Sequence, residues 1–290
     1  MSHLMDEIAS QPEVWSTAIE LAANAPLPVP GERVAVIGCG SSLNVSRAYA
    51  RLREAAGHGQ TDAYPASELT GGRQYDHMVF ISRTGTTTEV LAALREAPQG
   101  VITTSLTADR SASLARETSN SVLLDFADER SVVSSRFITA AIMLLRAHLG
   151  EDVRGLPAAA AAELARPLEP ELALRSEFTF LGCGWASFVA DEAALKLREA
   201  SRSWSESYPA MEYRHGPISV SDENTVVWGI GEIPDSLVAD AARTGATIVA
   251  PGGDPVVNLI GAQRLAVMLA ARKGIDPDQP RALSRSVILA

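Results

Sequence analysis

Short apolar runs alternate with longer amphipathic stretches along most of the chain. Two of these runs, 33–40 and 177–184, are rich in β-branched or aromatic residues and end in Gly-Cys-Gly. Each run is followed by a longer stretch with helical spacing of its apolar residues. The pattern therefore predicts, at both places, a strand, a tight turn and a helix in succession.

Further apolar runs continue the alternation in both halves of the chain. Additional strands are predicted at 77–82, 100–106, 121–126, 224–231 and 245–251. Helical patterns separate or follow them at 87–96, 111–117, 138–149 and 235–243. Strands that alternate with helices form a parallel sheet with helices on both faces, so an α/β fold of two doubly wound domains is expected.

The proline-flanked, alanine-rich stretch 158–175 is interpreted as the connection between the two domains. The first domain is predicted to span 1–157 and to include an N-terminal helix. The second is predicted to span 158–290 and to end in a C-terminal tail over the site.

An internal repeat supports this division. Gly-Cys-Gly occurs at 38–40 and again at 182–184, 144 residues later. AYPASEL at 63–69 matches SYPAMEY at 207–213 at the same offset, and LREA recurs between them at an offset of 145. Three matches in the same order indicate an α/β unit that was duplicated.

The two halves differ in the residues that follow the strands. The first half has Ser41 and Ser42 after its Gly-Cys-Gly, and the hydroxyl-rich turn 82–89 (SRTGTTTE), with Arg83, after a later strand. The second half has Trp185 and Ala186 at the first of these places. Free N–H groups and hydroxyls at a helix N-terminus bind anions, which favours a phosphate site in the first half. The alternative is that these Ser and Thr residues only cap helices.

The second half carries charged residues of both signs on one predicted helix. Glu192, Lys196 and Glu199 are spaced i, i+4 and i+7, which places them on one helical face. Such a face is often only solvated, but a lysine between two carboxylates can also keep one of them ionised as a general base. His215, in a Gly-Pro loop, is either simply exposed or placed to titrate near neutral pH.

Composition excludes several classes of protein. The net charge of −10 and the lack of a basic stretch argue against nucleic-acid binding. No apolar run approaches the roughly 18 residues of a membrane span, and the acidic start does not resemble a signal peptide. The two cysteines occupy matching contexts without metal-binding spacing. A cytoplasmic protein without metal, cofactor or membrane partner is expected.

Several motifs together resemble the sugar isomerase (SIS) family. They are GCGSS, SRTGTTTE, ERSVVSSR, ALKLREASRSWSESYPAMEYRHGP and the tail DPDQPRALSRSV. The chain is similar, over almost its whole length, to the isomerase domain of glucosamine-6-phosphate synthase and to stand-alone amino-sugar phosphate deaminases and deglycases. The resemblance implies two flavodoxin-like SIS domains and a 6-phosphosugar as ligand.

The resemblance also implies residue roles. It implies a sugar-phosphate cradle and sugar-lining residues at Cys39, Gly40, Ser41, Ser42, Ser82, Arg83, Thr84, Thr87, Val132, Ser134, Ser284 and Arg285. It implies that Glu199 moves a proton between C1 and C2, with Lys196 and Glu192 around it. His215 would assist ring opening and would come from the partner subunit of a homodimer.

Two departures from the synthases narrow the expected reaction. The chain begins Met-Ser-His and lacks the glutamine-hydrolysing domain that precedes the synthase isomerase domain, so glutamine is not expected as the nitrogen donor in cis. Arg285 stands where the synthases have a lysine that forms a Schiff base, and an arginine stays protonated. A deaminating isomerase is therefore favoured. A deglycase of an amino-acid-linked 6-phosphosugar and a phosphosugar sensor without turnover remain the alternatives.

Overall fold

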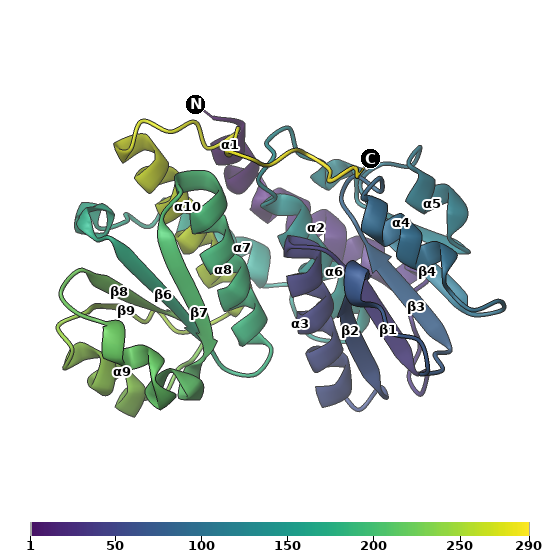
Figure 1. The fold of residues 1–290 in the computed structure, drawn as a ribbon, viewed down its shortest axis with the longest axis horizontal. Coiled ribbons are helices and arrows are strands. Elements are labelled where there is room, and N and C mark those ends of the chain that lie inside the picture. Colours follow the sequence, from purple (N-terminus) through teal and green to yellow (C-terminus); the bar gives the residue numbers. More distant parts are fainter. Residues whose placement is uncertain (1, 290) are drawn as a thin grey trace. The chain divides into compact units, whose positions relative to one another are not determined.

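The computed structural model describes residues 2–289 and divides into two compact units (Figure 1). The five-stranded unit comprises Glu13–Glu129, Arg136–Gly155 and Leu283–Ala290. The four-stranded unit comprises Met1–Pro12, Arg130–Ser135 and Leu156–Ala282.

The sheet of the five-stranded unit is parallel throughout, with the order β2-β1-β3-β4-β5. This is the order of doubly wound flavodoxin-like sheets, whose ligands bind beyond the carboxyl ends of the strands. β1 and β3 are adjacent and buried along their whole length, as expected for central strands that are covered on both faces. The strands are β1 (Val34–Gly38), β2 (Thr61–Pro65), β3 (His77–Ile81), β4 (Ile102–Thr107) and β5 (Asn120–Leu123).

Helices cover both faces of this sheet (Figure 1). One face packs α3 (Ser41–Ala55) and α6 (Arg136–His148), which lie against one another, and α2 (Gln11–Leu21) is joined to α6 by a hydrogen bond from Trp15 to Thr139. The other face packs α4 (Thr88–Arg95) and α5 (Ser113–Glu117) around an apolar cluster that includes Phe80.

The four-stranded unit repeats the arrangement on a smaller scale. Its parallel sheet has the order β7-β6-β8-β9. α8 and α10 lie side by side on one face, α9 covers the other, and α1 and α7 pack against α10. The elements are α1 (His3–Ala9), α7 (Leu156–Ala165), β6 (Glu177–Gly182), α8 (Ala186–Ser201), β7 (Trp204–Pro209), β8 (Thr225–Ile230), α9 (Asp235–Ala242), β9 (Thr247–Val249) and α10 (Pro255–Arg272).

The Gly-Cys-Gly turns require glycine for the same geometric reasons in both units. Gly38 and Gly182 end their strands where the following helix approaches closely: a Cβ at Gly38 would lie 2.7 Å from the Ser42 carbonyl carbon, and one at Gly182 would lie 2.3 Å from the Ala186 oxygen. The second glycines have φ of +54° at Gly40 and +58° at Gly184, a region that favours glycine. The motif is therefore a strand-to-helix turn in each unit.

The predicted α/β architecture with two parallel sheets is confirmed, and each predicted strand is present. Two further strands, β2 and β7, were not predicted; they are the edge strands beside β1 and β6. The stretch 158–175 is not a plain connection, because α7 and a short 3-10 helix (Pro170–Leu174) lie within it and belong to the four-stranded unit. Pro157 is compatible with α7 because it occupies the first turn, where its missing N–H has no intrahelical partner.

The division into units differs from the predicted domains at both termini. Residues 2–12, predicted to belong with the first domain, pack with the four-stranded unit. The tail 283–289, predicted to belong with the second domain, packs with the five-stranded unit. The predicted boundary after residue 157 lies two residues from the junction Gly155–Leu156.

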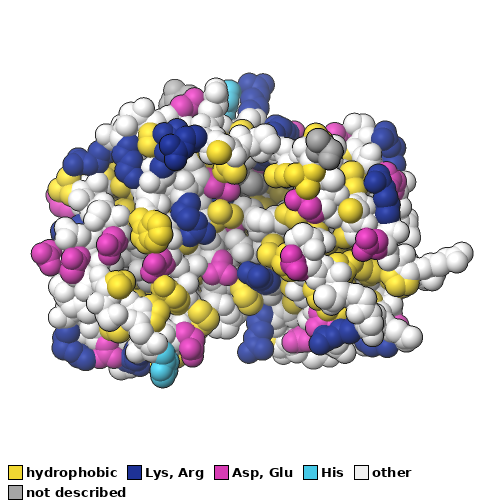
Figure 2. All heavy atoms as spheres, in the orientation of Figure 1, with side chains coloured by type: hydrophobic (Ala, Val, Ile, Leu, Met, Phe, Trp, Pro, Cys, Tyr) yellow, Lys and Arg dark blue, Asp and Glu magenta, His cyan; other side chains and the backbone are white. Residues whose placement is uncertain are grey.

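Among the described residues, no helix is long and apolar enough to cross a membrane. On the face drawn in Figure 2, basic side chains are dispersed among acidic and apolar ones instead of forming a continuous stripe.

Candidate active site

The predicted phosphate turn lies between β3 and α4, at the carboxyl edge of the five-stranded sheet. Gly85 has φ +61°, and its N–H donates to the Ser82 hydroxyl at 3.2 Å. The Ser82 and Thr87 hydroxyls are 3.2 Å apart, and Thr87 is the N-cap residue of α4. Hydroxyls and N–H groups thus converge at the positive end of a helix dipole, an arrangement suited to an anion.

The second predicted phosphate element lies on the adjacent strand. Cys39 and Gly40 follow β1, and Ser41 and Ser42 begin α3. Because β1 and β3 pair in parallel, their carboxyl ends meet at one edge of the sheet. Burial raises the pKa of the Cys39 thiol. The thiol therefore stays protonated at neutral pH and adds no negative charge to this turn.

Arg83 forms an ion pair with a buried carboxylate. Its Nη1 donates to Glu129 Oε2 at 2.9 Å, and the side chains are 7% and 0% exposed. The carbonyl of Arg83 accepts hydrogen bonds from Ala108 N and from the Thr107 hydroxyl. The positive charge of Arg83 is thus balanced by Glu129, and its predicted contact with phosphate stays a prediction.

We expect Arg83→Gln to lower the free energy of unfolding by about 1–3 kcal/mol, because glutamine can still donate to Glu129 but does not balance its charge. Urea denaturation measures this change. Arg83→Gln combined with Glu129→Gln should recover much of the stability. Unchanged stability with a large loss of phosphate affinity would instead make Arg83 mainly a phosphate ligand.

The C-terminal tail lies along the phosphate turn of the same unit. Thr84 and Thr86 donate to the Ser286 hydroxyl, and Thr88 N donates to the Val287 carbonyl at 3.2 Å. Arg285 forms a bidentate ion pair with Asp128 at 2.6 and 2.7 Å. Arg285 is exposed, and Ser284 is also exposed and donates to the Ser286 carbonyl. A cavity of about 390 Å³ borders Arg83, Thr84, Asp128 and Arg285.

The predicted acid–base group is assembled on α8 of the four-stranded unit. Lys196 Nζ lies 3.1 Å from Glu192 Oε1 and 2.6 Å from Glu199 Oε2. Lys196 and Glu192 are 2% exposed, whereas the Glu199 side chain is 19% exposed. Burial by itself would lower the pKa of Lys196, but the two carboxylates outweigh it and raise the pKa above its ordinary value. The ammonium is therefore fixed, and Glu199 is the carboxylate that solvent can reach.

The remaining predicted residues lie elsewhere in the four-stranded unit. Val132 and Ser134 belong to the loop Arg130–Ser135 and are half-buried. His215 ends a short 3-10 helix, Ala210–His215, and is exposed beside Gly216, which has φ +134°. Within this unit the structure brings Glu192, Lys196 and Glu199 into contact, and no hydrogen bond among the described residues joins His215 to them.

Three carboxylates next to the predicted residues were not identified from the sequence. Asp128 and Glu129 bind the two arginines of the five-stranded unit, and Glu7 binds the loop that contains Val132. Glu129 begins the motif ERSVVSSR and could have suggested an arginine partner, whereas Asp128 lies just before that motif. Glu7 lies 123 residues from Arg130, and no local pattern signals that contact.

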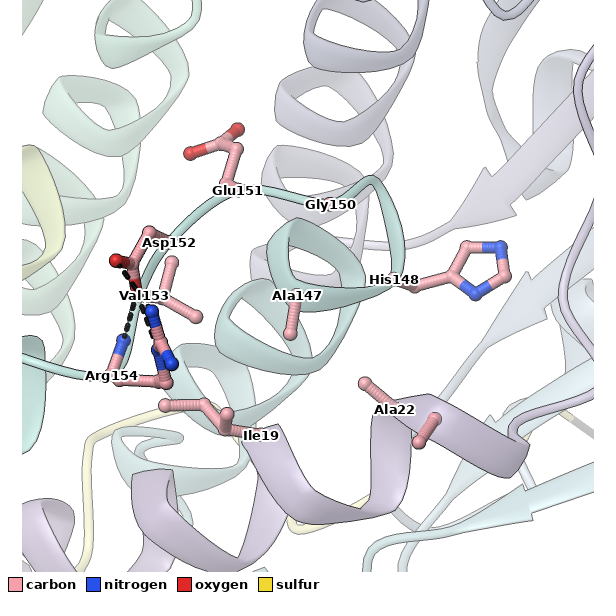
Figure 3. A pocket seen from close by; sticks show the side chains of 10 residues that line it. Ile19, Ala22, Ala147, His148, Gly150, Glu151, Asp152, Val153 and Arg154 are labelled. Atoms are coloured by element: carbon pink, nitrogen blue, oxygen red, sulfur yellow. Dashed lines mark hydrogen bonds and ion pairs between the residues drawn. The ribbon is translucent and has the colours of Figure 1, made fainter.

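A second cavity lies away from all of these residues. It measures about 460 Å³ in the five-stranded unit and is lined by Ile19, Ala147, His148 and the turn Gly150–Arg154 (Figure 3). Its ion pair joins Arg154 to Asp152, both strongly exposed. It contains none of the predicted site residues.

Comparison with known proteins gives one matching family model. Residues 30–149 match the SIS domain family. The chain is 27% identical over 293 residues to a glutamine–fructose-6-phosphate aminotransferase (isomerizing) of Sulfolobus acidocaldarius, with 88% of this chain and 50% of that protein covered. A protein of the same description from Methanothermobacter thermautotrophicus is 26% identical, with 88% and 51% covered. The chain thus spans about half the length of the curated relatives it matches.

Solved structures share the fold. The glucosamine-6-phosphate deaminase of Thermotoga maritima superposes with a TM-score of 0.84 at 24% identity, covering 99% of this chain and 100% of that one. The C-terminal domain of glucosamine–fructose-6-phosphate aminotransferase from Francisella tularensis gives 0.83 at 22% identity, with 97% and 98% covered. Tagatose-6-phosphate ketose/aldose isomerase of Escherichia coli gives 0.80 at 18% identity, with 98% and 97% covered.

The matched residues 30–149 contain both hydroxyl-rich turns of the five-stranded unit, and the similarity of fold extends over both units. Residues 30–149 are therefore assigned to a SIS domain, and the fold of the whole chain is the one these solved structures share.

Proposed function

We propose that this protein is a deaminating isomerase that converts an amino-sugar 6-phosphate into a keto-sugar 6-phosphate and ammonia. The observation that carries the proposal is the Glu192–Lys196–Glu199 group on α8, in which a buried ammonium holds the partly exposed carboxylate of Glu199 at 2.6 Å. A fixed carboxylate that solvent can reach is suited to abstract a proton next to a carbonyl.

Glu199 begins the chemistry on the open-chain aldose. Its carboxylate removes the C2 proton while the C1 oxygen gains a proton, which gives an enolamine. Return of a proton to C1 gives a C2 iminium ion with a C1 hydroxyl group. Water then adds to C2 and ammonia leaves, so a 2-keto sugar forms without an oxidant or cofactor.

The phosphate would be held by the two turns of the five-stranded unit, through the hydroxyls and N–H groups of Ser41, Ser42, Ser82, Thr84 and Thr87. The loop with Val132 and Ser134 would line the sugar, and Ser284 and Arg285 would approach from the tail. His215, supplied by the partner subunit of a homodimer, would assist ring opening.

The presence of Arg285 favours hydrolysis of an amino-sugar phosphate over its synthesis. A permanently protonated guanidinium cannot form the Schiff base through which a lysine would capture a ketose. In addition, Arg285 is held by Asp128 in a bidentate ion pair. Hydrolysis of an imine needs only water at that step.

We also infer that the two units arose by internal duplication. The strand orders β2-β1-β3-β4 and β7-β6-β8-β9 correspond, and each central strand ends in the same Gly-Cys-Gly turn. After duplication, one copy would have kept the hydroxyl-rich anion turn and the other the acid–base helix.

The proposal is tested by measuring ammonia release and ketose formation from glucosamine 6-phosphate and galactosamine 6-phosphate. We expect both products in equal amounts from at least one substrate. Ketose formation from an amino-acid-linked 6-phosphosugar alone would identify a deglycase. Tight 6-phosphosugar binding without any product would contradict the enzyme assignment and indicate a sensor.

A further inference from the structure

The loop Arg130–Ser135 lies between β5 and α6 in the sequence and packs with the four-stranded unit. The residues on either side of the loop are joined by a hydrogen bond. Glu129 Oε1 accepts it from Arg136 N at 2.7 Å, and the Glu129 side chain is fully buried. The loop is rich in hydroxyls, and it contains no helix or strand that would fix its conformation.

A second buried carboxylate binds the loop itself. Glu7, on α1, is 4% exposed, and its Oε1 accepts hydrogen bonds from Arg130 N at 2.5 Å and from Ser131 N at 3.2 Å. Its Oε2 binds the Ser131 hydroxyl. One side chain from the start of the sequence thus holds two consecutive peptide groups and one hydroxyl of the loop.

The helix that carries Glu7 is itself firmly anchored. The Asp278 carboxylate accepts hydrogen bonds from His3 N at 2.7 Å and Leu4 N at 2.8 Å, which caps the N-terminus of α1. The Asp278 carbonyl also accepts a hydrogen bond from Val132 N at 3.2 Å. Gln11 donates to Gln263 of α10 at 2.8 Å in a buried position.

We propose that Glu7 is a positioning residue that sets the conformation of the loop Arg130–Ser135 for contact with the sugar. This inference rests on the proposed function, since the role of Val132 and Ser134 as sugar contacts belongs to that proposal. Glu7 acts through the loop backbone and is not a catalytic residue. Glu7 lies 123 residues before Arg130 in the sequence, so the N-terminal helix would help to form the sugar site.

The chemistry requires a carboxylate at this position. Both oxygens of a carboxylate accept hydrogen bonds, and each can accept more than one. Glutamine would turn an NH₂ group toward a donor of the loop, so one hydrogen bond would be lost and two donors would face one another. Aspartate is one methylene shorter and could satisfy only part of the set.

The test compares Glu7→Gln with Asp6→Asn, an exposed carboxylate on the same helix. Amide hydrogen exchange reports on Arg130 N and Ser131 N, and steady-state kinetics with the best amino-sugar 6-phosphate give kcat and KM. Inhibition by inorganic phosphate reports on the phosphate turns alone. A Ser131→Ala variant, alone and combined with Glu7→Gln, tests whether the two residues act as one unit.

We expect Glu7→Gln to speed exchange at these two amides and to lower kcat/KM by about tenfold to a hundredfold, as small misplacements of site residues do. The inhibition constant of phosphate should stay within about twofold, and the double variant should be little worse than Glu7→Gln. Asp6→Asn should match the wild type in each measurement.

Two results would overturn the inference without touching the proposed function: unchanged exchange at Arg130 N and Ser131 N, or faster exchange with unchanged kcat/KM. A general loss of folding would appear as faster exchange throughout the protein and a weaker phosphate inhibition, and would also count against it. A wild-type protein that neither converts nor binds 6-phosphosugars would instead refute the proposed function.

Discussion

Glu199→Gln is expected to reduce turnover of an amino-sugar 6-phosphate by a factor of about 10²–10⁴, the usual effect of removing a general base. The amide retains the shape of the side chain but cannot take the C2 proton. Its hydrogen bond to Lys196 can persist, because the amide oxygen still accepts. Steady-state rates of ketose formation, compared with the wild type, measure the effect.

The matched control is Glu223→Gln, which changes an exposed glutamate in the same unit. We expect its kcat to stay within about twofold, the difference expected of a surface substitution away from the site. The affinity of Glu199→Gln for the 6-phosphosugar, measured by calorimetry, should also be retained, since the phosphate turns lie in the other unit. Retained turnover in Glu199→Gln would exclude Glu199 as the base.

The second large effect is one of stability. Lys196→Met should lower the free energy of unfolding by about 3–5 kcal/mol, because it removes the ammonium that neutralises the buried Glu192 carboxylate. Urea denaturation at pH 7 measures the change. Lys196→Met combined with Glu192→Gln removes both charges and should be more stable than Lys196→Met alone.

The pH dependence has a definite sign. The pKa of Lys196 is raised in the folded protein, so its contribution to stability is complete below the unfolded pKa of about 10.4 and is lost as the pH rises through the folded value. The stability difference between the wild type and the double variant Lys196→Met with Glu192→Gln, which leaves no unpaired buried carboxylate at this position, should therefore be constant between about pH 6 and 9. A difference that changes within that range would mean that the lysine is not held as an ammonium.

The central strands of the fold could be predicted because both have the same sequence feature, an apolar run that ends in Gly-Cys-Gly. β1 and β6 are buried on both faces, so they appear as continuous apolar runs, and the Gly-Cys-Gly turns end them. The edge strands do not carry this signal. β7 reads Trp-Ser-Glu-Ser-Tyr-Pro and is only partly buried, so its polar side chains resemble a loop until the pairing with β6 is known.

The site was predictable only in part, for a related physical reason. The Glu192–Lys196–Glu199 contact follows from helical spacing alone, and the structure forms it. The partners of Arg83, Arg285 and the loop after Glu129 come from distant parts of the chain. Contacts set by tertiary packing leave no period in the sequence, which is why the ion pairs of the arginines and the position of Glu7 became visible only in three dimensions.

The most direct test of the account follows proton transfer at carbon itself. The substrate and a matching ketose 6-phosphate are incubated with the enzyme in D₂O, and incorporation of deuterium at C1 and C2 is followed by NMR. The account predicts incorporation with the wild type and its loss with Glu199→Gln, whether or not nitrogen leaves. Equal incorporation by both proteins, or equal product formation by both, would contradict the role of Glu199 as the proton-transferring base.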